Sequence, residues 1–154
     1  PMNRAGGGGK DRYTEKVGVV FHSMEESVTN QNMLKYARWM VILVIITTLS
    51  QASTGLSSMY EYNTAPSHAW TAQIGLLACL ALVVLVIMSK TDSSKVKGMS
   101  FGLLFVWVLQ YGMGEMFAKM HWVSLIHAVI AMGILLHTMA LLRALPSVDA
   151  DPAV

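Results

Sequence analysis

Residues 69–88 read AWTAQIGLLACLALVVLVIM, a run of twenty residues without a single Asp, Glu, Lys or Arg. A helix rises about 1.5 Å per residue, so a run of this length is what the roughly 30 Å hydrocarbon layer of a bilayer requires. Three further runs have the same character and contain only one charged residue, Glu115: Trp39–Ser58, Met99–Ala118 and Trp122–Leu142. The sequence therefore predicts an all-α polytopic membrane protein, folded as a bundle of four transmembrane helices.

The overall composition points the same way. Hydrophobic residues make up 54% of the 154 residues and charged residues only 13%, about half the share usual in soluble domains. A single cysteine, Cys79, excludes an intramolecular disulfide framework and any zinc or iron–sulfur site built from cysteines. The formal net charge of +2 is too small to indicate a nucleic-acid partner.

Three segments are expected along the chain. Residues 1–38 form a polar arm, residues 39–145 the four-helix bundle, and residues 146–154 a short tail. The arm contains four consecutive glycines, Gly6 to Gly9, which we expect to be flexible, and its later apolar residues suit the membrane surface or a partner. We therefore expect the bilayer and other integral membrane subunits as partners.

The positions of Lys and Arg predict the orientation in the membrane. Six lie in the arm, three lie between the second and third spans, and Arg143 lies near the C-terminal end, which makes ten of the eleven. Only Lys119 falls on the other side. Loops rich in Lys and Arg stay in the cytoplasm, so we expect both termini to be cytoplasmic, in a prokaryotic cell membrane.

An internal repeat relates the two halves of the bundle. Residues 39–86 align without a gap on residues 98–145, a shift of 59 residues that gives ten identities. The informative ones pair Gln51 with Gln110, Gly55 with Gly114, and His68 with His127. Both halves start on the same side of the membrane, so the two helical hairpins form a parallel repeat with its axis along the membrane normal. The two histidines are then expected at the same depth, near the outer surface.

Two imidazoles facing each other across a bundle lined by small residues suit a haem. Haem iron takes two axial ligands from opposite faces, and a neutral imidazole nitrogen is a common one. The expected cofactor is one b-type haem between His68 and His127, with Gly55 and Gly114 beside it and Gln51 and Gln110 on the same helix faces. The alternative is that the small residues only allow close helix packing, and that the histidines lie in interfacial water without a cofactor.

The pattern Gln51-x3-Gly55…His68-Ala69, which recurs as Gln110-x3-Gly114…His127-Ala128, resembles one four-helix half of haem A synthase and similar small cytochrome-b-like membrane proteins. The resemblance covers residues 39–145. It implies that His68 and His127 are axial haem ligands. Because the loops are short and no substrate cavity is indicated, we expect a non-catalytic, electron-transferring subunit of a respiratory or oxidase-type complex. The alternative is a structural accessory subunit without a cofactor.

A few other residues could carry chemistry. Met116, Met120 and His121 cluster at the outer end of the third span, and thioether and imidazole ligands select Cu(I), so copper is a further alternative. Glu115 is the only carboxylate within a span, which suggests proton transfer or quinone contact, but Lys119 four residues later offers it an ordinary ion pair. His137 has no counterpart in the repeat and is expected to be a hydrogen-bonded packing residue.

Overall fold

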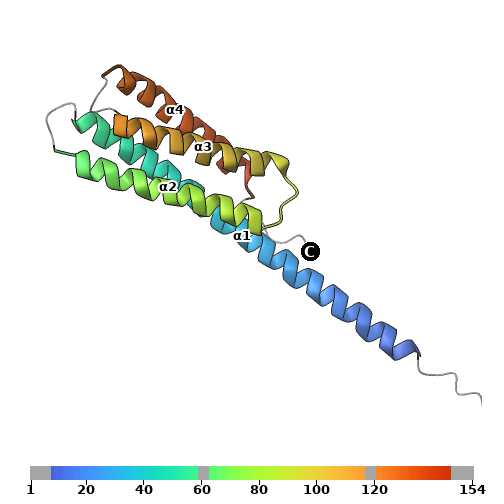
Figure 1. Ribbon diagram of the computed structural model, residues 1–154. Helices are drawn as coiled ribbons and strands as arrows, with labels where there is room; N and C mark the ends of the chain where they lie inside the picture. The colour runs from blue at the N-terminus through green and yellow to red at the C-terminus, as the bar shows by residue number, and fades with distance from the viewer. Residues whose placement is uncertain (1–7, 59–62, 117–120, 147–154) are drawn as a thin grey trace, which may run out of the picture.

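The computed structural model describes residues 8–58, 63–116 and 121–146 of the chain. Within these ranges the regular structure is helical, with α1 at Gly8–Ser58, α2 at Ala65–Met88, α3 at Ser94–Met116 and α4 at His121–Ala144 (Figure 1). Each of the four contains a segment long and apolar enough to cross a membrane. The predicted all-α, four-helix membrane bundle is confirmed.

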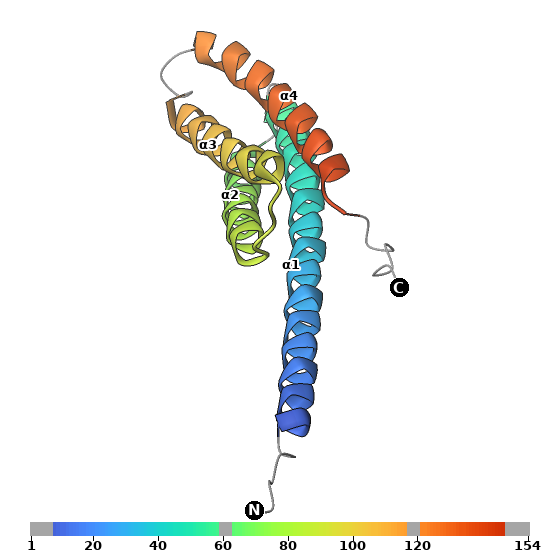
Figure 2. The ribbon, with the colours of Figure 1, turned by 90° about the vertical axis from the view of Figure 1, so that its right-hand side faces the viewer.

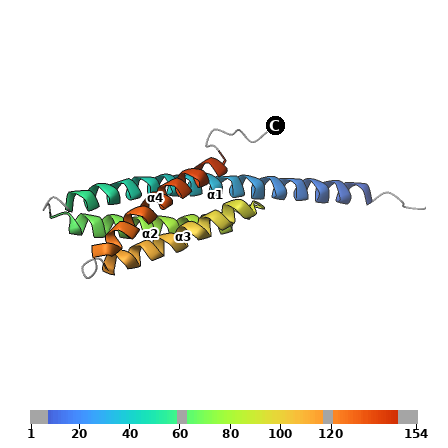
Figure 3. The same ribbon diagram turned by 90° about the horizontal axis from the view of Figure 1, so that it is seen from above.

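The four helices pack in a ring in chain order. α1 lies beside α2 and α4, and α3 also lies beside both of them, so α1 faces α3 and α2 faces α4 across the diagonals. Figures 2 and 3 show that α1 continues in a nearly straight line well past the other three helices. We call the end of the bundle from which α1 extends the arm end. The opposite end, where α1 ends and α2 begins, is the far end.

The bundle has a small apolar interior and a large apolar exterior. The interior is formed by side chains that are at most 2% exposed, among them Val41, Val44, Leu82, Leu103 and Ile134. Many large apolar side chains point outward and are more than half exposed, for example Ile46, Leu77, Phe105 and Leu136. A belt of this kind suits lipid and not water.

Exposed tryptophans mark both ends of that apolar belt. Trp39 lies near the arm end, whereas Trp70 in the second turn of α2 and Trp122 in the first turn of α4 lie at the far end. All three are more than half exposed, and amphipathic indole rings collect at the two membrane–water interfaces. The tryptophans therefore bracket a membrane layer that includes the span Trp39–Ser58 of α1.

Polar contacts between helices help to hold the ring together. Trp107 of α3 donates from Nε1 to the carbonyl oxygen of Ala72 at 3.2 Å, and its indole fills the space beside Gly75 of α2. At the arm end, Arg38 of α1 donates from Nη1 to the carbonyl oxygens of Leu142 and Leu145 at 2.8 and 3.1 Å. These carbonyls lie at the C-terminal end of α4, where a cation is favoured by the unpaired carbonyl groups.

Of the four glycines in the arm that were expected to be flexible, Gly8 and Gly9 lie in α1. α1 begins at Gly8 and runs unbroken into the membrane span, so the arm leaves the bundle along the axis of α1 (Figure 1). Once a stable span has nucleated a helix, each added residue gains a hydrogen bond, and residues 8–38 contain no proline to stop it.

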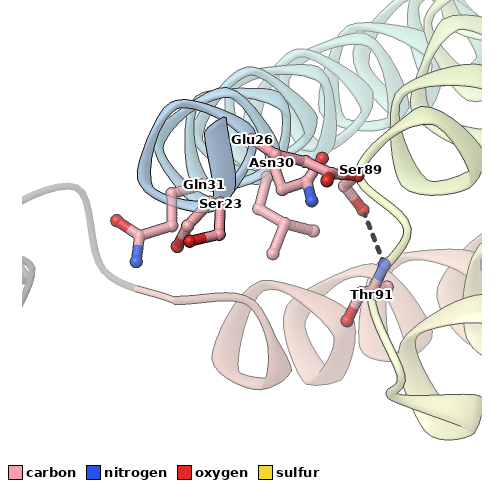
Figure 4. A pocket seen from close by; sticks show the side chains of 8 residues that line it. Ser23, Glu26, Asn30, Gln31, Ser89 and Thr91 are labelled. Atoms are coloured by element: carbon pink, nitrogen blue, oxygen red, sulfur yellow. Dashed lines mark hydrogen bonds between the residues drawn. The ribbon is translucent and has the colours of Figure 1, made fainter. Parts of the chain in front are cut away.

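The arm touches the bundle where it passes the α2–α3 connection. Lys90 Nζ lies 2.6 Å from Glu26 Oε1, an ion pair between exposed side chains. Beside it lies an open hollow of about 400 Å³, lined by Leu34 and by polar side chains of the arm and the connection (Figure 4): Ser23, Glu26, Ser27, Asn30, Gln31, Ser89 and Thr91.

Candidate functional site

The start of α2 is fixed against α1 at the far end of the bundle. Pro66 lies in the first turn of α2, where its missing N–H costs nothing. The backbone N–H of His68 donates to the carbonyl oxygen of Thr64 at 2.9 Å, and the hydroxyl of Thr64 donates to the carbonyl oxygen of Thr54 at 2.8 Å. These bonds place His68 in the first turn of α2, beside the last turns of α1.

Each predicted glutamine binds the backbone of the histidine in its own half of the repeat. Gln51 Nε2 donates to the carbonyl oxygen of His68 at 2.5 Å and to Thr71 Oγ1 at 2.6 Å. Gln110 Nε2 donates to the carbonyl oxygen of His127 at 2.9 Å. The donor and the acceptor are 17 residues apart in both cases, so the two hairpins repeat the same contact in space.

Each predicted glycine lies under the imidazole of its half. A Cβ atom added to Gly55 would stand 3.5 Å from Cε1 of His68, and one added to Gly114 would stand 3.8 Å from Cε1 of His127. The imidazoles therefore approach the backbones of α1 and α3 closely. A side chain larger than alanine at either position would compete with the ring for this space.

The two imidazoles meet across the diagonal between α2 and α4. Their ring centroids are 6.2 Å apart and their planes are inclined by 41°. The structure thus brings together at the far end all six residues that the repeat singled out: Gln51, Gly55, His68, Gln110, Gly114 and His127.

Thr54 belongs to the same site, although the sequence analysis did not single it out. Its Oγ1 lies 3.0 Å from Nδ1 of His68. The available signal was its spacing, because Thr54 comes three residues after Gln51 and so lies on the same helix face. The comparison of the two halves did not reveal Thr54, because the position 59 residues later is Met113 and not threonine.

The remaining predicted residues contribute less. His137 Nε2 lies 2.8 Å from the carbonyl oxygen of Met99, the contact expected of a hydrogen-bonded packing histidine. The side chain of Met116 is about half exposed. Lys119 and Met120 lie outside the described residues, as do the side chains of Glu115 and His121, so neither the expected ion pair nor the alternative copper site can be located.

The donor set at the far end is small. In the part of the chain that the structure describes, no three or more His, Cys, Asp or Glu side chains come together as a metal site. Two imidazoles fall short of the three or four protein ligands that a zinc ion takes. They are the number that haem iron takes when the porphyrin supplies the other ligands. No family model, curated protein or solved structure matches the chain, so the assignment depends on its own residues.

Proposed function

We propose that this protein binds one b-type haem between His68 and His127 and serves as an electron-transferring subunit of a larger membrane complex. The observation that carries the proposal is the separation of the two imidazoles, 6.2 Å between ring centroids, on helices that face each other across the bundle. The repeated glutamine and glycine contacts support it, because they hold the two rings in equivalent places.

The separation of the rings agrees with ligation of one metal ion from two sides. With metal–imidazole bonds of about 2.0–2.1 Å and about 1.1 Å from a ring nitrogen to its centroid, two such rings have centroids about 6.2–6.4 Å apart. An interplanar angle of 41° is compatible with this, because each ring can turn about the bond to the metal. Glycine at positions 55 and 114 lets each ring lie against the backbone of the neighbouring helix.

The chain's own groups have defined tasks in this proposal. The imidazoles of His68 and His127 donate nitrogen lone pairs, and Gln51 and Gln110 hold the backbone of each ligand in place. Both histidines are partly buried at the far end of the bundle. When bound, the haem supplies a one-electron couple of its iron.

The wider role is proposed from the resemblance, the distribution of charge and the exposed surfaces. The resemblance of residues 39–145 to one four-helix half of haem A synthase supports haem binding but not synthase chemistry, which leads us to a non-catalytic subunit. The distribution of Lys and Arg supports cytoplasmic termini, with the haem near the outer surface. The long exposed arm and the apolar exterior support contact with further membrane subunits.

The decisive experiment is an absorption spectrum of the full chain, purified in detergent from cells supplied with haem precursor and copper. The proposal requires a stoichiometric Soret band and the low-spin spectrum of bis-imidazole haem. The matched control is the double variant His68→Ala/His127→Ala, which should insert and purify equally but without this spectrum. A colourless, metal-free wild-type protein would contradict the proposal and favour a structural accessory subunit. Bound copper without a Soret band would favour the copper alternative.

A further inference from the structure

We infer that Thr54 is a positioning residue that fixes the tautomer of His68 and leaves its Nε2 lone pair available to bind a metal. The inference rests on the proposed haem site and names a residue outside the repeat pattern. It starts from the 3.0 Å separation between Thr54 Oγ1 and His68 Nδ1.

The direction of this hydrogen bond follows from the other contacts of Thr54. A threonine hydroxyl has one proton to donate and two lone pairs that accept. Thr54 Oγ1 lies 2.8 Å from the carbonyl oxygen of Ser50 and 3.2 Å from that of Gln51. Carbonyl oxygens can only accept, and the carbonyl oxygen of Ser50 is the nearest of the three acceptors, so we assign the hydroxyl proton to it. With this assignment, Nδ1–H of His68 donates and Thr54 Oγ1 accepts.

A protonated Nδ1 determines the other ring nitrogen. In neutral imidazole one nitrogen carries the proton and the other carries a lone pair. His68 is therefore held as the Nδ1–H tautomer, with Nε2 free to bind a metal. Partners of this kind fix the orientation of a metal-binding histidine and raise its basicity, and their loss typically costs 10- to 100-fold in metal affinity.

Thr54 is itself held in place by the start of α2. Its carbonyl oxygen accepts from the hydroxyl of Thr64, the N-cap residue of the helix that carries His68. The hydroxyl of Thr54 and the ring it binds are thus fixed by the same pair of helices. The repeat position of Thr54 is Met113, whose thioether accepts hydrogen bonds only weakly.

The first test uses metal-free protein and therefore does not depend on haem. The full chain is labelled with ¹⁵N-histidine in lipid nanodiscs, and His68 is assigned by its loss in His68→Gln. Ring ¹⁵N chemical shifts should identify the Nδ1–H tautomer in wild type and in Thr54→Ser, and a shift toward the Nε2–H tautomer in Thr54→Val. Thr48→Val is the matched control, because Thr48 Oγ1 donates to the carbonyl oxygen of Val44 in the same helix. Unchanged ring shifts in Thr54→Val would overturn the inference.

The second test titrates the same proteins with haemin. We expect Thr54→Val to bind about 10- to 100-fold more weakly, and Thr54→Ser and Thr48→Val to bind as wild type does. If wild type binds haemin and Thr54→Val binds it equally well, the inference fails while the proposed function stands. If wild type binds no haemin, the proposed function fails, and the role of Thr54 toward iron fails with it, whatever the tautomer.

Discussion

The imidazoles of His68 and His127 lie 6.2 Å apart, centroid to centroid, although they belong to α2 and α4, which stand diagonally in the bundle. Neighbouring helices α1 and α3 contribute glycines at the two places where a side chain larger than alanine would crowd these rings. The close approach of the two imidazoles therefore depends on the two histidines and the two glycines together. It is what gives the far end of the bundle its candidate chemistry.

Loss of either ring should remove one ligand and leave the other in place. We expect His68→Ala and His127→Ala each to abolish the low-spin spectrum and to lower haem retention on gel filtration, because ligation from two sides fails when either ligand is lost. Imidazole added to the buffer should restore the spectrum in part. His137→Ala should keep it, since His137 is bound to the carbonyl oxygen of Met99. A low-spin spectrum that survives in either single variant would show that a different residue is the ligand.

Packing between α2 and α3 depends on Gly75. A Cβ atom there would overlap the indole of Trp107, so we expect Gly75→Ala to destabilise the bundle by about 1–3 kcal/mol. Gly112→Ala is the control, since a Cβ there meets no other atom within 4 Å, and its effect should be neutral or stabilising by at most about 1 kcal/mol. Unfolding in mixed micelles with increasing denaturing detergent would measure both. Equal stability of the two variants would contradict the packing shown by the structure.

The fold was predictable because the membrane imposes a simple rule on sequence. Runs of about twenty apolar residues identify the spans, and the predicted ends at Ser58 and Met88 are the observed ends of α1 and α2. The other boundaries differ. α3 starts at Ser94, ahead of the expected Met99, since a helix can begin in the polar interface before its apolar run. α1 begins thirty-one residues before Trp39. The apolar composition of a run identifies the part of a helix that lies in lipid, but it does not identify a helix that continues into water.

The site was predictable only where the repeat copied it. Gln51 and Gln110 were found because identical residues recur at one spacing, and the structure gives them the same contact. Thr54, Thr64 and Thr71 were not found, because the second half has Met113, Val123 and Ile130 in their places. Their hydrogen bonds to one another and to His68 depend on how α1 and α2 cross, which a pattern of single residues does not encode.

The guanidinium of Arg38 should stabilise the C-terminal end of α4 against local unfolding. It donates to the carbonyl oxygens of Leu142 and Leu145, and hydrogen bonds from a charged group contribute about 1.5–3 kcal/mol. We expect Arg38→Met to speed amide hydrogen exchange in the last turns of α4 by about 10- to 100-fold, while exchange at the far end stays unchanged. Arg143→Met, which changes an exposed side chain in the same region, is the control. Equal exchange rates in the two variants would show that α4 is held by apolar packing alone.

Orientation is the last prediction. The arm, the α2–α3 connection with the first turn of α3, and the end of α4 lie together at the arm end, and ten of the eleven Lys and Arg belong to these segments. Short loops rich in Lys and Arg stay on the cytoplasmic side of a membrane. The arm end should therefore face the cytoplasm, and the histidines should lie near the outer surface. Ser67 at the far end and Asp92 in the α2–α3 connection are both exposed and suit cysteine substitution.

An impermeant thiol reagent applied to intact cells should therefore label Ser67→Cys and leave Asp92→Cys unlabelled until the cells are opened. The parent chain is the background control, because its single cysteine, Cys79, is fully buried. If only Asp92→Cys were labelled in intact cells, the orientation would be the opposite of the predicted one. The haem site would then face the cytoplasm, and its redox partner would have to be sought on that side.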